Sequence, residues 1–185
     1  RGAFAKHLPT KDYIGLDFSK KAKDMAVKDG INIKNEMIQD YAISNPSSAD
    51  IVISFQVLEH VSDPKLFIEG KLATLVDGGL MIVAVPSENS YLNYTTNDIL
   101  NMPPHHVSRW SDNTLQFIAE KYNLEIVEIY HDKLQKEHKK SFLNTLIASS
   151  ILKPSILNTS FLYSVLMRFI GLLSAVLVRG LKDEM

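Results

Sequence analysis

The sequence contains no cysteine among its 185 residues. Disulfide bonds, zinc sites built from thiolates and cysteine nucleophiles are therefore excluded. An excess of charge of one sign is also missing, because 20 Lys and Arg residues nearly balance 21 Asp and Glu residues. Binding to nucleic acid depends on clustered basic residues that neutralise phosphates, so no nucleic-acid partner is expected.

Internal repeats, low-complexity segments and a visible signal peptide are missing as well. Hydrophobic residues make up 45% and charged residues 22%, close to the averages of soluble proteins, which argues against disordered, collagen-like and coiled-coil classes. With no cysteine, the composition is compatible with a reducing cytoplasm, where we expect the protein. The one basic run, Lys133 to Lys140, fits a solvated helix face or a contact with anionic lipid or phosphate.

From Asp12 to Pro86, short apolar runs rich in β-branched residues alternate with helical patterns, which is typical of an α/β fold with a parallel sheet. Ser19 and Asp63 are the expected N-caps of the two helices in this part, and Pro64 follows at the first helical position. The expected strands cover residues 12–17, 35–40, 49–55 and 79–86.

After Pro86 the pattern changes to a long polar and aromatic segment, residues 87–111, which we interpret as a loop or lid. A helix is expected over residues 111–123 and a strand, exposed on one face, over 124–130. We therefore expect one domain over residues 1–132 and a helical, strongly apolar extension over 133–185.

The extension contains a very apolar segment at residues 161–181 with a narrow stripe of less apolar residues. Such a helix must be covered by something. Three interpretations stay open: packing on the domain or on a second copy of the chain, a helix lying in the plane of a membrane surface, or a membrane span. Arg168 near the middle argues against lipid on all sides.

Acidic residues stand at the expected carboxyl ends of the first two strands, where parallel α/β sheets bind their ligands. Asp17 is placed to accept hydrogen bonds from the two hydroxyls of a ribose, or simply to cap the following helix. Asp40 could meet an exocyclic adenine amine, or could be an ordinary turn residue.

The third strand end gives a more specific motif. "DIVISFQVLEHVSDP", followed by a helix and "LVDGGLMIVAVP", resembles the middle of the class I S-adenosylmethionine-dependent methyltransferases, in particular their small-molecule branch. "YIGLDFSKKAKDMA" is similar to the second strand and helix of the same family. The resemblance covers residues 2–130 and implies a Rossmann-like, mostly parallel, doubly wound sheet.

The resemblance also implies a cofactor, S-adenosylmethionine, and the residues that bind it. Asp17 would bind the ribose hydroxyls, Phe18 would cover the adenine, and the turn at Asp40 and Tyr41 would meet the adenine edge. The backbone around Phe55, Gln56 and Val57 would hold the methionine end.

The family's first strand and its Gly-x-Gly-x-Gly turn would come directly before the first helix, and only Gly2 corresponds to them. Gly2 is then the last glycine of the cofactor-binding turn, whose backbone N–H groups face the cofactor's carboxylate. We therefore expect an N-terminally truncated methyltransferase that lacks the first strand of its sheet. This truncation is expected to reduce or abolish the activity of this chain.

Three histidines are candidates for the base that removes a proton from the methyl acceptor: His60, His105 and His106. Beside the last two, Arg109 and Trp110 could bind an anionic or sugar-like substrate. Alternatively, His60 hydrogen-bonds the following loop, Trp110 anchors the lid, and one of the paired histidines caps the next helix. No metal site is expected, because neighbouring residues rarely both reach one ion.

The predicted function is methyl transfer from S-adenosylmethionine to a small molecule or to a glycan or lipid precursor. The alternative is a degenerate, non-catalytic module used for assembly or membrane docking. Under either hypothesis, residues 161–181 are the expected contact with a membrane surface or with a second copy of the chain. A nicotinamide-dependent oxidoreductase would share the ribose-binding acid but would not explain "LEHVSDP".

Overall fold

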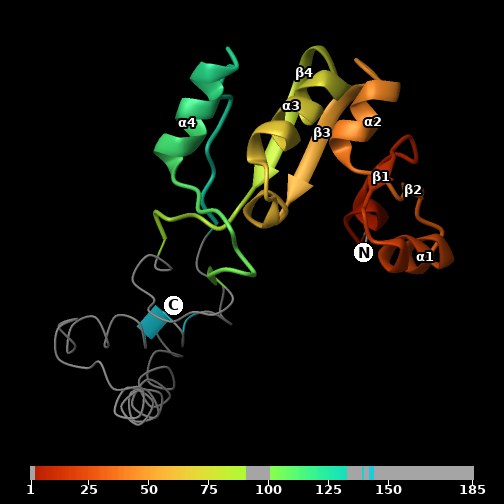
Figure 1. Cartoon of the computed structure of the whole chain (residues 1–185), viewed down its shortest axis with the longest axis horizontal. Coiled ribbons are helices and arrows are strands. Elements are labelled where there is room, and N and C mark those ends of the chain that lie inside the picture. Colours follow the sequence, from red (N-terminus) through yellow and green to blue (C-terminus); the bar gives the residue numbers. More distant parts are fainter. Residues whose placement is uncertain (1–2, 91–100, 133–138, 140–141, 144–185) are drawn as a thin grey trace. The chain divides into compact units, whose positions relative to one another are not determined.

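The structure is a computed structural model of the chain and describes residues 3–90, 101–132, 139 and 142–143. The chain divides into two compact units, Arg1–Val85 and Pro86–Met185. The first unit contains most of the labelled elements of Figure 1. In chain order the elements of this unit are η1 (Ala3–His7), β1 (Gly15–Leu16), α1 (Lys20–Lys28), β2 (Ile33–Lys34), α2 (Ile38–Ser44), β3 (Ala49–Phe55), η2 (Leu58–His60), α3 (Pro64–Thr74) and β4 (Leu75–Ala84).

The helices of the first unit begin where the sequence predicts, because polar side chains cap them. Ser19 Oγ accepts a hydrogen bond from the Ala22 N–H at the start of α1 (3.3 Å). Asp63 Oδ1 accepts one from the Leu66 N–H at the start of α3 (3.0 Å). Each bond satisfies an N–H group that a helix cannot pair internally. Both predicted helices are thus confirmed.

The strands form two parallel pairs, β1 with β2 and β3 with β4. The prediction of a parallel arrangement is confirmed for each pair. Strand β3 has the predicted bounds, and Ile51 to Phe55 pair in register with Leu80 to Ala84. The register shifts between Ala49 and Ile51. The Gly-Gly turn of the paired strand β4 lies opposite this shift, with Gly78 at φ 76°. Glycine suits that left-handed conformation.

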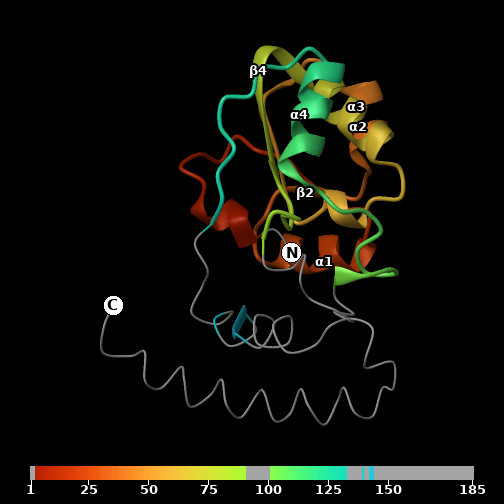
Figure 2. The same ribbon diagram turned by 90° about the vertical axis from the view of Figure 1, so that its left-hand side faces the viewer.

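Helix α3 packs against both strands of the longer pair, and α2 packs against α3, as can be followed in Figure 2. They approach closely at Gly70, where an added Cβ would lie 2.9 Å from Gln39 Cα. The shorter strand pair packs with α1 and η1 around three buried residues, Ala26, Ile31 and Ile33. Hydrophobic burial therefore holds each strand pair against its own helices.

One predicted strand, residues 35–40, is wrong. The second strand is β2, which ends at Lys34, and Asp40 and Tyr41 lie inside helix α2. Tyr41 and Ala42 are buried on the inner face of this helix. The six-residue run was too short for periodicity to separate a strand from a helix, and packing against α3 decides for the helix.

In the second unit, helix α4 (Asp112–Lys121) confirms the prediction, with Ser111 as its N-cap. The predicted strand at residues 124–130 is wrong, because these residues are described without strand or helix. Alternating hydrophobicity gives a strand only where a neighbouring strand accepts its hydrogen bonds, and none of the described strands pairs with this segment. Val127 and Tyr130 are accordingly exposed.

Candidate functional site

The carboxyl end of β1 is held in shape by the side chain of Asp17. Its backbone N–H donates to Lys34 O (3.1 Å), and its Oδ1 accepts from the Ser19 N–H (2.8 Å). The predicted capping role is therefore present. The other carboxylate oxygen makes no hydrogen bond within the described residues, so it stays available to hydroxyl donors of a ligand.

The next residue, Phe18, leaves its ring in solvent. It is 78% exposed, although a phenyl group gains free energy from burial. A large exposed ring beside a carboxylate at a strand end offers an apolar face and a hydrogen-bond acceptor together. This combination suits a ligand with a flat ring attached to a sugar.

The carboxyl end of β2 lies beside that of β1, because the two strands pair in parallel. Asn35 bridges them, its Nδ2 donating to Asp17 O (2.8 Å). Glu36 follows, half-buried, at the position where Asp40 was expected. Asp40 is instead exposed in the first turn of α2, and Tyr41 is buried with the Lys34 ammonium 4.9 Å from its ring centre.

Glu36 and Asn35 were not among the predicted site residues, because the second strand was expected at residues 35–40 and ends at Lys34. A signal was present, since polar residues follow the β-branched Ile33 directly. The predicted location of Asp40 and Tyr41 in a turn is wrong. Their contact with a ligand stays a prediction.

The carboxyl end of β3 carries the residues of the "FQVLEH" motif. Phe55 packs edge-on against Phe4 of η1, with ring centres 4.9 Å apart. Gln56 has a positive φ of 53°, and its N–H donates to Ala84 O (2.8 Å). The strand therefore turns sharply after Phe55, which places Val57 and the 3-10 helix η2 at the carboxyl end of the β3–β4 pair.

His60 is the last residue of η2. Its backbone N–H donates to Val57 O (2.9 Å), and about half of its side chain is accessible. Its neighbour Glu59 is only 1% exposed. The structure thus places an accessible imidazole at the carboxyl end of β3, as predicted, together with a buried acid that the prediction did not include.

The remaining predicted residues lie in the second unit, in the segment from Ser87 to Ser111. Its two ends are tied together, because the Glu88 N–H donates to Trp110 O (2.9 Å). Trp110 is 6% exposed, and its ring N–H donates to Ser108 Oγ (3.0 Å). This environment agrees with the alternative in which Trp110 anchors the loop.

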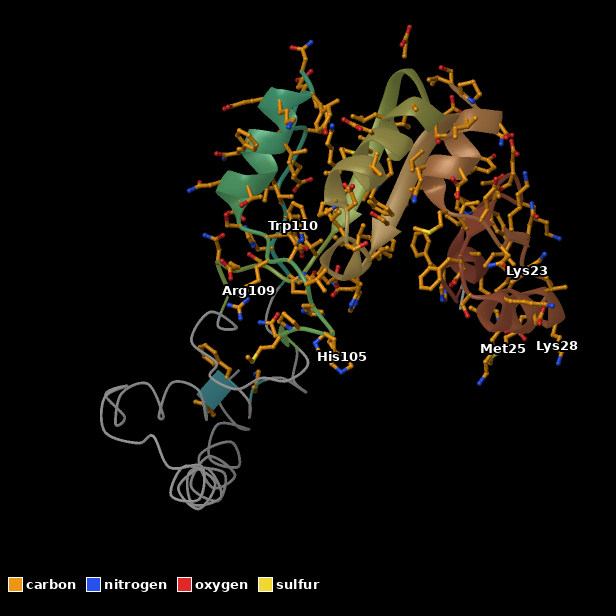
Figure 3. All side chains as sticks on the ribbon, viewed as in Figure 1. Lys23, Met25, Lys28, His105, Arg109 and Trp110 are labelled. Atoms are coloured by element: carbon orange, nitrogen blue, oxygen red, sulfur yellow. The ribbon has the colours of Figure 1, made fainter. Side chains whose placement is uncertain are left out.

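Figure 3 shows the side chains of His105, Arg109 and Trp110 in this loop. His105 is exposed, whereas His106 is half-buried with its Nδ1 2.9 Å from Asn101 Oδ1. Arg109 Nη1 donates to Glu88 Oε1 (3.2 Å). Because both members of this ion pair are partly exposed, Arg109 can still direct other N–H groups to a ligand.

The family of the chain follows from a comparison with known proteins. A family model described as a methyltransferase domain matches residues 1–129. The chain belongs to this methyltransferase domain family. No curated protein and no solved structure matches the chain. The match includes the strand ends of the first unit and the loop and helix α4 of the second, so the predicted resemblance is confirmed.

Two predicted parts of the methyltransferase lie outside the described residues, namely Gly2 and the apolar segment 161–181. In the described part of the chain, no helix is long and apolar enough to cross a membrane.

The first unit of the methyltransferase also buries a lysine that the sequence did not single out. Lys71 of α3 is 1% exposed, and its Nζ donates to Ser54 Oγ (2.8 Å) and to Ile82 O (3.0 Å). Burial lowers the pKa of Lys71 from 10.5 to about 7. The side chain connects α3 to both strands of the β3–β4 pair.

Proposed function

We propose that this methyltransferase uses S-adenosylmethionine as its methyl donor. The observation that supports this most is at the end of β1, where Asp17 has an oxygen without a hydrogen bond in the described structure and Phe18 is 78% exposed. Both groups suit an adenosine, since the ribose supplies hydroxyl donors and the adenine supplies a flat ring. A doubly wound, Rossmann-like sheet is the arrangement we propose around these strand ends.

The residues at the neighbouring strand ends complete the proposed cofactor site. Glu36 at the end of β2 offers a carboxylate to the adenine edge, which is the role predicted for Asp40 and Tyr41. Phe55, Gln56 and Val57 at the end of β3 border the methionine end. Gly2 keeps its proposed role at the cofactor's carboxylate.

When bound, S-adenosylmethionine supplies a methyl group on a positively charged sulfur. The protein's part is to align the acceptor, exclude water and accept a proton when the acceptor is a hydroxyl. His60 is accessible for this purpose at the end of β3, and His105 and His106 are the candidates in the loop of the second unit.

For the substrate we propose a small molecule or a glycan or lipid precursor. Arg109, with Glu88 beside it, and the exposed His105 provide charged and hydrogen-bonding groups that suit an anionic or hydroxyl-rich compound. We propose a cytoplasmic enzyme, and the apolar sequence of residues 161–181 supports a contact with a membrane surface or with a second copy of the chain.

Titration calorimetry of the full-length protein with S-adenosylhomocysteine tests the proposal. Asp17→Asn keeps the cap on the Ser19 N–H but removes the charge, so we expect affinity to fall about tenfold or more, the effect of one charge-assisted hydrogen bond. Asp24→Asn is the matched control, because Asp24 is exposed on α1, and its affinity should equal that of the wild type.

The proposal fails if the wild-type protein binds neither S-adenosylhomocysteine nor S-adenosylmethionine. Equal affinities of Asp17→Asn and Asp24→Asn would show that the charge of Asp17 does not contribute to binding. In the first case, the non-catalytic module would become the better hypothesis.

A further inference from the structure

Glu59 is the most unusual polar residue of the first unit. It is 1% exposed, and neither carboxylate oxygen has a hydrogen-bond partner among the described residues. A buried carboxylate without donors lowers stability, because the lost hydration is not replaced. Proteins keep such groups mainly where they serve a function, so Glu59 calls for an explanation beyond packing.

The turn that follows β3 forces Glu59 into this position. Leu58 is buried at 1% exposure, and the His60 N–H donates back to Val57 O (2.9 Å), so η2 has a fixed orientation. Within this turn Glu59 points inward, whereas about half of the His60 side chain is accessible. The two side chains stay close, with Glu59 Oε1 3.8 Å from His60 Nε2.

We propose that Glu59 is a positioning residue for His60. Its carboxylate faces Nε2, so it favours the tautomer that carries the neutral ring's proton on Nε2 and thereby restricts the orientation of the imidazole. The carboxylate also balances the positive charge that the ring gains when it takes up a proton. A buried acid behind an accessible imidazole is the arrangement that a general base needs.

The use of this pair in catalysis rests on the proposed function, whereas the pairing itself does not. In the transfer, a lone pair of the acceptor's oxygen or nitrogen forms the bond to the methyl carbon. The carbon–sulfur bond breaks, and its electron pair remains on sulfur as a neutral thioether. The acceptor's proton passes to the His60 ring, and the carboxylate of Glu59 compensates the new charge.

Nuclear magnetic resonance of the full-length protein labelled with ¹⁵N-histidine tests the pairing, because two-bond ¹H–¹⁵N spectra show which ring nitrogen carries the proton. His60→Ala assigns the His60 signals by their disappearance. In the wild type we expect the neutral ring to carry its proton on Nε2. In Glu59→Gln we expect a mixture of both tautomers, because the neutral amide can serve as donor or acceptor.

Two measurements separate positioning from a structural role. Urea unfolding of Glu59→Gln should give a midpoint equal to or above that of the wild type, since the substitution removes a buried charge and preserves shape. Glu69→Gln, which changes an acid of α3 paired with Lys65 at 3.9 Å, should leave the His60 spectrum unchanged.

The inference is overturned if the wild-type ring carries its proton on Nδ1 or on both nitrogens, or if Glu59→Gln leaves the tautomer unchanged. It is also overturned if the urea midpoint of Glu59→Gln falls clearly below that of the wild type. Titration with S-adenosylhomocysteine gives an independent result. If the spectra behave as expected but no ligand binds, the pairing stands and the proposed function fails.

Discussion

At the scale of single residues, the described part of the first unit buries one acidic and one basic side chain, and their hydrogen bonding differs. Lys71 has two acceptors, Ser54 Oγ and Ile82 O, whereas the carboxylate of Glu59 has no hydrogen-bond donor among the described residues. Burial of an ammonium lowers stability while it is charged, even when hydrogen bonds compensate part of the loss. The stability of the fold should therefore depend on the protonation of Lys71.

The sign of this dependence follows from the pKa of about 7 in the folded state and 10.5 in the unfolded chain. Between these values the unfolded state binds more protons, so the free energy of unfolding rises with pH. Below pH 7 the cost of burying the charge is fully present, and above pH 10.5 it is gone. In Lys71→Met this contribution is removed at every pH.

Urea unfolding of the wild type and of Lys71→Met at pH 6 and pH 9 measures the effect. The wild type should gain about 3 kcal/mol relative to the variant between the two pH values, since each pKa unit corresponds to ~1.4 kcal/mol. Met also leaves Ile82 O without its hydrogen-bond donor. Comparing the two pH values separates the effect of the charge from this loss. A difference that does not change with pH would contradict the lowered pKa of Lys71.

Single residues with local partners were predictable from the sequence. Ser19 and Asp63 cap helices because the N–H groups that donate to their side chains lie three residues ahead, a relation that spacing alone reveals. The burial of Glu59 and Lys71 was not predictable, because it depends on which elements pack over them. The sequence around Glu59 and around Lys71 is equally compatible with a solvent-exposed helix face.

At the scale of helices and strands, close packing of α2 against α3 makes residues 38–44 helical, where the sequence had predicted a strand over residues 35–40. An added Cβ at Gly70 would lie 2.9 Å from Gln39 Cα and 3.0 Å from Gln39 N. These are backbone atoms, which cannot rotate away as a side chain can. The glycine therefore sets the distance between the two helices.

We expect Gly70→Ala to lower the free energy of unfolding by about 1–3 kcal/mol, as overpacking does. Alanine by itself favours a helix by ~1 kcal/mol over glycine, so a loss would show that packing dominates. Urea unfolding monitored by circular dichroism gives the value. Lys65→Ala, on the exposed side of α3, should change stability by less than ~0.5 kcal/mol. Stabilisation by Gly70→Ala would contradict the close approach.

Long elements were more predictable than short ones. β3, α3 and α4 combine clear periodicity with caps or turn residues, and the structure has them where the sequence predicts. The run at 35–40 and the run at 124–130 have no such boundaries, so their state depends on neighbours in space. Packing against α3 makes the first a helix, and the second pairs with none of the described strands.

At the scale of the whole molecule, the motifs around β1, β3 and the Gly-Gly turn predicted the family because their order along the chain is specific. The family match over residues 1–129 confirms it. The division into units at Val85 and the separation of the strands into two pairs were not predictable from these motifs. Such features depend on which hydrogen-bond partners each strand edge finds, and the local sequence does not determine those partners.

We propose that the strand ends of the first unit hold S-adenosylmethionine. Hydrogen exchange of the full-length protein, with and without S-adenosylhomocysteine, tests the location of binding directly. We predict slower exchange at residues 15–18, 33–36 and 55–60, the carboxyl ends of β1, β2 and β3 with the residues that follow them. Unchanged exchange in these three segments, with saturating ligand present, would contradict binding at these strand ends.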